Sequence, residues 1–279
     1  MKRRDFITLL GGAAAWPLAA RAQQAGKRYM VGILSAGGSS VQAALNAAFS
    51  DGLREWGWVE GKNVVFENRN AEDRLERLPE LAADLIRLKV DVIVAAGTLA
   101  PLAAKQATAT IPIVMTTAGD PLGSGLVASL ARPGGNVTGL TWDADPGFTL
   151  KNVELLGELH ALPQRIGGII DPASPPNIGL ETAQRGAMRP GLDLHAVEVR
   201  APDQMEKAFA SLQAARADAV LVFGGSSMLF GSRDKIAQLG LKNRLPVMFQ
   251  YREGAESGGL LSYGPSIPDL WRRSAIYVE

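Results

Sequence analysis

The sequence predicts an α/β protein built as two similar lobes, each containing a parallel sheet. Short apolar runs of strand character alternate with helical patterns along the chain, and this alternation is typical of parallel sheets with right-handed crossovers. The alternation forms two successive series, which are interrupted near residues 143–146. With 279 residues, the chain is long enough for two lobes.

The first series contains five predicted strands and three predicted helices. The run at residues 91–97 is apolar almost without interruption, which suits a strand covered on both faces. The first helix repeats its apolar residues at helical spacing, from Leu45 to Trp56. We expect strands at residues 29–34, 64–67, 91–97, 111–115 and 137–142, and helices at residues 45–56, 78–88 and 99–108.

The second series repeats the pattern. We expect strands at residues 166–170, 192–199, 218–223 and 245–249, and helices at residues 150–159, 177–188, 205–212 and 228–239. A glycine-rich stretch follows the last of these strands, and it suits a return of the chain to the first lobe. We therefore assign residues 28–142 and 260–279 to lobe one, and residues 143–259 to lobe two.

The first 22 residues carry the features of an export signal. A basic head, Lys2-Arg3-Arg4, precedes an apolar run that ends at an Ala20-Arg21-Ala22 cleavage site. This apolar run is too short to cross a bilayer core of about 30 Å. The motif Arg3-Arg4-Asp5-Phe6-Ile7 is a twin-arginine pattern. We therefore predict a twin-arginine signal peptide at residues 1–22 and a periplasmic protein.

Composition narrows the class of protein further. The chain has no cysteine, so it has no disulfide, no thiolate metal site and no lipid-attachment cysteine. Removal of residues 1–22 takes away four of the 29 basic residues and one of the 28 acidic residues, which leaves 25 against 27. This balance gives no indication of a nucleic-acid or anionic-membrane partner. We expect a soluble monomer without a direct membrane anchor.

The residues do not favour an enzyme. Neither His160 nor His195 has a recognisable catalytic partner, and the chain has no H-E-x-x-H, G-x-S-x-G or Walker motif. Residues 123–128 fit the dinucleotide pattern G-x-G-x-x-A, but they follow the fourth strand of the series rather than the first. Asp120 just before them would repel a pyrophosphate. We therefore predict no catalytic residues, no metal and no cofactor.

The loops that follow the strands predict a ligand cleft. Ligands of parallel α/β sheets bind at the carboxyl ends of the strands, and two lobes that turn these ends towards each other enclose a cleft. The loops at these positions are small, polar and poor in charge. They comprise residues 35–40, 97–98, 116–121, 171–177 and 224–227.

Three features of this cleft each allow two interpretations. Asp120 could receive a ligand ammonium group beside the hydroxyls of the preceding threonines, or it could cap a short helix expected at residues 126–130. Tyr263 near the return crossing suits a place at the hinge or buried packing. The segment Tyr251-Arg252-Glu253 suits the cleft rim or a surface ion-pair turn.

Two stretches carry a resemblance to a known family. They are GDPLGSGLVASLARPGGNVTGLTW at residues 119–142 and LPVMFQYREGAESGGLLSYGPS at residues 245–266. Together with the twin-arginine leader, they resemble the periplasmic substrate-binding proteins of ABC importers, of the tryptophan- and tyrosine-binding type. The resemblance implies two Rossmann-like lobes of the periplasmic-binding-protein type I architecture, which are joined by a hinge and close on the ligand.

The resemblance also implies which residues face the ligand. They are Ser35, Gly97, Thr98, Thr117 and Asp120 in lobe one, Ser226, Ser227 and residues near 171–177 in lobe two, and Tyr263 at the crossing. The sequence differs from the family pattern in two places. Gly254 occupies a position where the family usually has a bulky aromatic residue, which would alter the cleft rim. The family pattern also continues beyond Glu279, so we expect a missing C-terminal segment and reduced stability.

These observations predict a non-enzymatic periplasmic receptor. It would capture a small solute, an aromatic or other amino-acid-like molecule, between its lobes and deliver it to an ABC permease in the inner membrane. One alternative is a periplasmic ligand-sensing protein that partners a membrane receptor. Another is an enzyme on a doubly wound fold, which the lack of nucleophile, metal and phosphate motifs disfavours.

Overall fold

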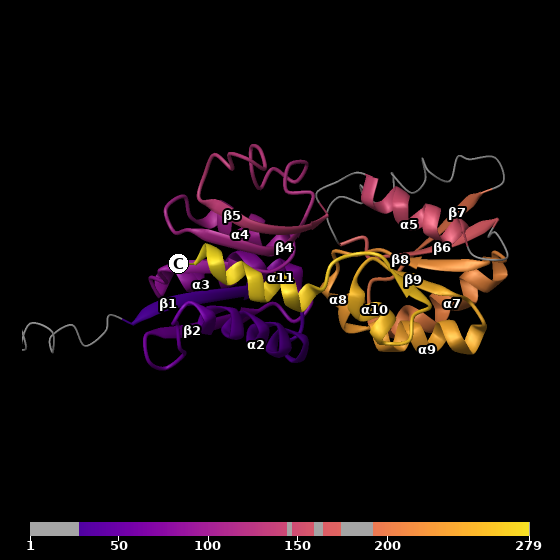
Figure 1. The fold of residues 1–279 in the computed structure, drawn as a ribbon, viewed down its shortest axis with the longest axis horizontal. Coiled ribbons are helices and arrows are strands. Elements are labelled where there is room, and N and C mark those ends of the chain that lie inside the picture. Colours follow the sequence, from indigo (N-terminus) through magenta and orange to yellow (C-terminus); the bar gives the residue numbers. More distant parts are fainter. Residues whose placement is uncertain (1–27, 144–146, 159–163, 174–191, 279) are drawn as a thin grey trace, which may run out of the picture.

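The computed structural model describes residues 28–143, 147–158, 164–173 and 192–278. Within these residues the chain forms two parallel five-stranded sheets, which lie one after the other along the long axis of the molecule (Figure 1). The strand order is β2-β1-β3-β4-β5 in the first sheet and β10-β9-β8-β6-β7 in the second. The predicted α/β class with two parallel-sheet lobes is confirmed.

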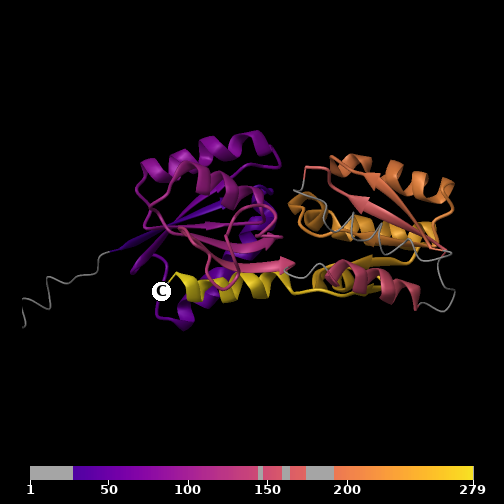
Figure 2. The ribbon, with the colours of Figure 1, turned by 90° about the horizontal axis from the view of Figure 1, so that it is seen from above.

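Helices cover both faces of the first sheet (Figure 2). Its strands are β1 (Tyr29–Ser35), β2 (Val64–Asn70), β3 (Val92–Ala95), β4 (Ile113–Gly119) and β5 (Val137–Asp143). The helices α3 (Leu78–Arg87) and α4 (Leu99–Ala107) pack on one face, and α2 (Ser39–Glu55) packs on the other. Leu45, Phe49 and Leu53 of α2 are buried, as their spacing predicts, whereas Trp56 follows the helix end and is exposed.

The second sheet is covered in the same way. Its strands are β6 (Arg165–Ile170), β7 (Asp193–Glu198), β8 (Ala219–Val222), β9 (Val247–Phe249) and β10 (Leu261–Ser262). Its helices are α5 (Gly147–Gly157), α7 (Met205–Ala214), α8 (Ser227–Gly231), α9 (Arg233–Asn243) and α10 (Arg252–Glu256). α7 and α9 bury their apolar residues against one face of the sheet, and α5 does so against the other.

The chain returns to the first lobe through α11 (Ile267–Ser274), which packs against α2 (Figure 1). The two helices approach closely because Gly52 of α2 has no side chain: a Cβ atom there would lie directly against the carbonyl oxygen of Arg272. Residues 261–262, which we assigned to lobe one, instead pair with β9 of the second sheet. The return therefore begins after Ser262, because backbone pairing with β9 continues to that point.

Two predicted helices differ in the structure. Residues 126–130 form bends and irregular backbone rather than a helix. Gly125 has a positive φ of 72°, and the backbone N–H of Ala128 donates to the carbonyl of Pro133, so the segment closes as a turn. The predicted helix at residues 228–239 is divided into α8 and α9, which meet at Ser232.

Packing in the second lobe accounts for the glycine at residue 254. It lies buried in α10, where a Cβ atom would press directly on the ring of Phe249. A bulky side chain at residue 254 would displace that ring from the core of the second lobe. The expected effect on the cleft rim stays a prediction.

Some predictions concern residues outside the described ranges. These are the signal peptide at residues 1–22, the helix at residues 177–188 and most of the loop at residues 171–177. In the part of the chain that is described, no helix combines the length and the apolar character needed to cross a membrane.

Candidate functional site: a cleft between the lobes

The carboxyl ends of both sheets face a cavity, which we call the aromatic compartment. It encloses about 560 Å³ of space not filled by atoms, including its open mouth. Four aromatic residues line it: Trp142 from β5, Phe230 from α8, Tyr251 at the start of α10 and Trp271 from α11. Among the described residues around this cavity, none carries a charged side chain. The compartment is therefore suited to a neutral, apolar group.

A second cavity, the charged compartment, adjoins the first. It encloses about 550 Å³ on the same measure, and the two cavities share Ala96, Gly97, Gly225, Ser226 and Ser227 in their walls. Its lining differs because it includes the carboxylates of Asp73 and Asp171 and the guanidinium of Arg200. The cleft thus has one neutral aromatic part and one part that carries charges of both signs.

The two lobes touch at the wall between these compartments. A Cβ atom placed on Gly37, in the loop after β1, would lie 2.8 Å from the Cβ atom of Ser227 at the start of α8. A Cβ atom on Gly231 would lie 3.2 Å from Val41 of α2. The glycines at these two positions therefore allow the lobes to close on each other.

Threonine hydroxyls connect the loops that follow β3 and β4. β4 is irregular at Thr116 and Thr117, where its pairing register with β5 shifts, and such bulges redirect side chains. The Thr117 hydroxyl accepts a hydrogen bond from the backbone N–H of Gly97 at 3.1 Å. The Thr98 hydroxyl accepts one from the N–H of Gly119 at 2.9 Å. These two bonds hold the loop after β3 against the end of β4. Gly97 in that loop has a positive φ of 66°.

Ser226 joins two loops of the second lobe. Its hydroxyl donates to the carboxylate of Asp171 at 2.6 Å, and it accepts from the N–H of Leu229 at 3.1 Å. The second bond caps the N-terminus of α8, where the first N–H groups of a helix lack partners within the helix. Ser226 therefore holds Asp171 and the start of α8 in one arrangement at the cleft.

Trp142 of lobe one lies against the glycines of lobe two. A Cβ atom on Gly224 would be 2.8 Å from its ring, and one on Gly225 would be 3.3 Å away. The ring also meets Phe148 of α5 edge-on at 5.6 Å between centroids. Trp142 therefore bridges the lobes at the point where the chain passes from β5 to α5. Only tertiary contacts reveal this role, because the sequence shows just a tryptophan at a strand end.

Three polar atoms of the aromatic compartment's lining residues are buried without a hydrogen-bond partner in the described structure. They are the indole nitrogens of Trp142 and Trp271 and the hydroxyl of Tyr251. Burial raises the pKa of the Tyr251 phenol above its usual value, so this group remains protonated. All three groups can donate a hydrogen bond.

Burial and neighbouring carboxylates raise the pKa of Asp73. Partial burial raises the pKa of Asp73, and the neighbouring carboxylates of Glu72 and Asp171 raise it further. Asp73 belongs to lobe one and Asp171 to lobe two, so this repulsion acts across the cleft. A cation placed between them would relieve it.

Most of the predicted ligand positions come together around the cleft. Ser35, Gly97, Thr117, Ser226 and Ser227 line the aromatic compartment. Gly97, Thr98, Ser226 and Ser227 line the charged compartment, together with Asp171 from the predicted loop at residues 171–177. Sequence reasoning placed Tyr251 at the cleft rim as one of two interpretations. It missed Trp142, Phe230 and Trp271 and the charged residues Asp73 and Arg200, which no motif marks.

Asp120 lies outside both compartments. One of its carboxylate oxygens accepts a hydrogen bond from the N–H of Gly123 at 2.9 Å, and its φ is 36°. Its backbone carbonyl accepts from the hydroxyl of Ser124 at 2.7 Å. Asp120 therefore closes a turn, and the predicted cap of a helix at residues 126–130 is wrong because no helix follows.

Tyr263 is exposed rather than buried, and Arg252 takes part in a surface ion pair, which was one of the two interpretations of its segment. Tyr263 is 43% exposed and stacks on Phe148 at 5.8 Å between ring centroids, so it is neither buried nor part of either compartment. Arg252 forms an ion pair with Glu256 at 2.8 Å. Tyr251 beside it is buried and lines the cleft, so the segment contributes to the cleft through its first residue.

Two lobes that face each other through the carboxyl ends of parallel sheets define a class of protein, the two-lobed solute-binding proteins. The fold is that of the type I periplasmic-binding-protein-like structures. The chain belongs to the family described as ABC transporter substrate binding protein, whose sequence pattern matches residues 37–278. Family membership confirms the predicted resemblance and identifies a solute-binding protein rather than an enzyme.

Similar proteins are known from several bacteria. A tyrosine-binding protein of Clostridioides difficile is 27% identical over 215 residues, which cover 77% of this chain and 61% of that protein. The chain therefore spans less than two thirds of the length of this relative. The structure of a conserved domain protein from Vibrio cholerae is 25% identical with a TM-score of 0.80, covering 90% of this chain and 84% of the other. The ABC domain from Streptococcus pneumonia in complex with L-Trp has 21% identity, a TM-score of 0.77 and the same coverage.

Proposed function

We propose that this protein is the periplasmic binding component of an ABC importer for an aromatic or related amino acid. The aromatic compartment between the lobes is the observation that carries this proposal. Its apolar rings can bury a ligand side chain, and buried apolar surface is the main source of affinity in such sites. The tyrosine-binding protein and the structure with L-Trp support the same ligand class by similarity.

The ligand stabilises the closed form in this proposal. Residues of both lobes surround the cleft, so a ligand makes its full set of contacts only when the lobes meet at Gly37 and Ser227. A ligand that binds one state better shifts the population towards that state. The permease would then recognise the closed form, so that the ligand-bound protein is the one that delivers its solute.

The proposed ligand contacts follow the two compartments. Ser35 and Thr117 from lobe one and Ser226 and Ser227 from lobe two would face the ligand from opposite sides of the aromatic compartment, with Gly97 and Thr98 beside the charged compartment. Asp120 and Tyr263 stand apart from both compartments and are not included among these contacts.

The export route forms a separate part of the proposal. The twin arginines Arg3 and Arg4 and the cleavage site at Ala22 support delivery to the periplasm through the twin-arginine pathway. Fusion of the leader to a reporter that is active only after export tests this. The Arg3→Lys/Arg4→Lys double variant should lose export, and export that persists in it would contradict this route.

Ligand binding is tested directly by thermal shift and calorimetry. The protein is screened with each of the common L-amino acids and with small aromatic acids. At 100 times its Kd, a specific ligand stabilises the folded state by about 2.7 kcal/mol, which raises Tm by roughly 5–10 °C for a chain of this size. If the folded protein shows no shift and no heat of binding with any aromatic amino acid, the proposed ligand class is wrong.

A further inference from the structure

Trp142 at the end of β5 lies in a socket that belongs to the second lobe. A Cβ atom on Gly224 would lie 2.8 Å from the six-membered ring of its indole, and one on Gly225 would lie 3.3 Å from it. Phe148 of α5 meets the indole edge-on, at 5.6 Å between ring centroids. We call Gly224, Gly225 and Phe148 the tryptophan socket. The indole fits there because the two glycines have no side chains.

A buried glutamine holds the socket in shape. The side-chain oxygen of Gln250 accepts a hydrogen bond from the backbone N–H of Gly224 at 2.8 Å, and its side-chain nitrogen donates to the hydroxyl of Thr149 at 3.2 Å. Thr149 directly follows Phe148 in α5, so one side chain connects both parts of the socket. Gln250 and Thr149 are buried, and satisfied hydrogen bonds in a buried place keep one arrangement rigid.

The first lobe holds the other side of the indole. A Cβ atom on Gly119, the last residue of β4, would lie 3.0 Å from the ring nitrogen of Trp142. The hydroxyl of Thr141, the residue before the tryptophan, donates to the carbonyl of Ala118 in β4 at 2.5 Å. Trp142 is therefore fixed to the first lobe, whereas its socket is fixed to the second.

The socket also lies beside two crossings of the chain between the lobes. Trp142 immediately precedes the last residue of β5, and Phe148 is the second residue of α5 on the other side of the first crossing. Tyr263 begins the return crossing and stacks on Phe148 at 5.8 Å between ring centroids. A Cβ atom on Gly264 would lie directly against the carbonyl oxygen of Gln250. Movement of one lobe relative to the other therefore changes the contact between the indole and its socket.

We propose that the seating of Trp142 in the tryptophan socket acts as a latch, which favours the closed arrangement of the lobes and thereby raises ligand affinity. The proposal rests on the proposed function, since it takes ligand binding to require closure. The indole buries apolar surface against the second lobe only while the lobes are together. The apparent Kd equals the intrinsic Kd divided by the fraction of protein in the binding-competent form. Trp142 is thus a positioning residue that acts through the closed population.

Gly224→Ala tests the latch from the side of the socket. Gly224 is not among the described residues that line either compartment, so the substitution leaves those linings unchanged. The added methyl group would press on the indole, and overpacking of this kind should shift the ratio of closed to open protein by about 5- to 150-fold. Gly157→Ala in α5 is the matched control, because a Cβ atom there would meet no atom of the described residues within 4 Å.

Electron–electron double resonance measures the distance between the lobes without any ligand. The chain has no cysteine, so spin labels can be placed at Glu80→Cys in α3 and Lys207→Cys in α7, both of which are exposed positions. Gly224→Ala and Trp142→Ala should each move the population from the shorter to the longer distance, while Gly157→Ala keeps the wild-type distribution. In the Trp142→Ala background, Gly224→Ala should open the lobes no further, because its methyl group then meets no ring.

Calorimetry with L-tyrosine and L-tryptophan connects the latch to binding, and thermal melts check that each variant is folded. Affinity of Gly224→Ala should fall by the same factor as its closed fraction. Wild-type distance distributions in both Gly224→Ala and Trp142→Ala would overturn the proposal, and so would an equal effect of Gly224→Ala in the Trp142→Ala background. Unchanged affinity in variants that open would overturn it as well. If neither amino acid binds the wild type while the variants still open, the proposed function fails and the latch is supported.

Discussion

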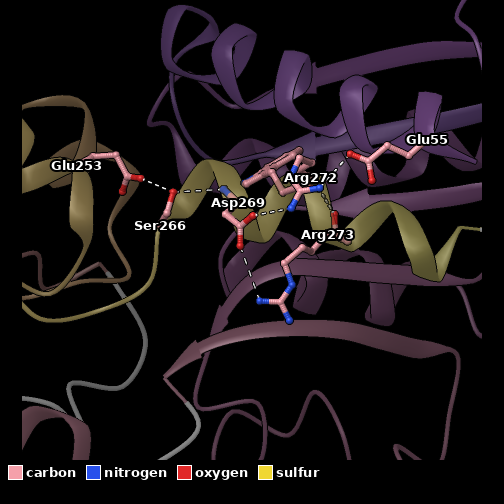
Figure 3. Close-up of polar contacts among 8 residues, drawn as sticks. Glu55, Glu253, Ser266, Asp269, Arg272 and Arg273 are labelled. Atoms are coloured by element: carbon pink, nitrogen blue, oxygen red, sulfur yellow. Dashed lines mark hydrogen bonds and ion pairs between the residues drawn. The ribbon is translucent and has the colours of Figure 1, made fainter.

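The carboxylate of Glu253 in the second lobe accepts a hydrogen bond from the hydroxyl of Ser266 at 2.7 Å, at the start of the helix that returns to the first lobe (Figure 3). The same carboxylate accepts from the backbone N–H of Ile267 at 3.2 Å. Ser266 in turn caps α11 by accepting from the N–H of Asp269 at 3.3 Å. Farther along the helix, Arg272 connects Asp269 to Glu55 of α2. A chain of polar contacts therefore runs from α10 of one lobe to α2 of the other.

Removal of Glu253 should loosen this connection. Glu253→Ala leaves the Ser266 hydroxyl and the Ile267 N–H without their acceptor at a helix N-terminus, where a negative charge is favourable. We expect a loss of roughly 1–3 kcal/mol in the free energy of unfolding, and a loss of about 1 kcal/mol for Ser266→Ala. Urea unfolding measures both. The double variant should lose less than the sum, because the two residues share one interaction.

Glu256→Ala provides the control for that prediction. Glu256 lies three residues further along α10 and forms an exposed ion pair with Arg252, and such pairs contribute about 0–1 kcal/mol. If Glu253→Ala is no more destabilising than Glu256→Ala, the contact between α10 and α11 has no stabilising role.

An added methyl group at Gly37 should keep the lobes apart. The new Cβ atom would lie 2.8 Å from that of Ser227, and overpacking of this kind costs about 1–3 kcal/mol. In the proposed mechanism these residues meet only in the closed form, so ligand affinity should fall by about 5- to 150-fold while the Tm of the free protein changes little. Gly135→Ala introduces the same group where no atom lies within 4 Å, and it should leave affinity unchanged. Equal affinities in the two variants would show that this contact is not part of closure.

Acid should favour the closed form through Asp73. Its pKa is raised above the ordinary value of 3.8 by partial burial and by the carboxylates of Glu72 and Asp171. Below 3.8 the group is neutral in both the closed and the separated states, and no penalty arises. As the pH rises through the higher pKa of the closed form, ionisation repels Asp171 across the cleft, so closure weakens. Arg200 faces the same compartment and partly offsets this repulsion.

Small-angle scattering between pH 7 and pH 4 measures this effect. The ligand-free protein should become more compact as the pH falls, and Asp73→Asn should be compact at both values. Asp203→Asn, an exposed substitution outside both compartments, should behave like the wild type. An Asp73→Asn profile that follows the wild type would assign the pH dependence to other groups.

The fold was predictable because its signals are local. The continuous apolar run at residues 91–97 contains β3, and the helical spacing of Leu45, Phe49 and Leu53 describes the buried face of α2. The turn at residues 126–130 was not predictable in this way. Its apolar residues Leu126 and Val127 are buried as they would be in a helix, but the backbone bond from Ala128 to Pro133 determines a turn.

The cleft was predictable only where it depends on strand ends. Thr98 follows β3, Thr117 lies in β4 and Ser226 follows β8. Topology alone therefore places each of them towards the carboxyl end of its sheet. Trp271 reaches the cleft from a helix that returns after the second lobe, and Trp142 does so because glycines of the other lobe leave it room. Such contacts depend on how the lobes meet, which periodicity does not encode.

Ser226 should combine a structural role with one at the cleft. Its hydroxyl caps α8 and also donates to Asp171, so Ser226→Ala should cost about 1–2 kcal/mol in the free energy of unfolding and release the Asp171 carboxylate into the charged compartment. Ser226→Thr keeps the hydroxyl and should retain most of the stability. Ser232 precedes α9 in the same way and is also buried, but its side chain makes no capping bond. Ser232→Ala should therefore cost less than Ser226→Ala, and equal losses in urea unfolding would show that burial, rather than the two hydrogen bonds, accounts for the effect at Ser226.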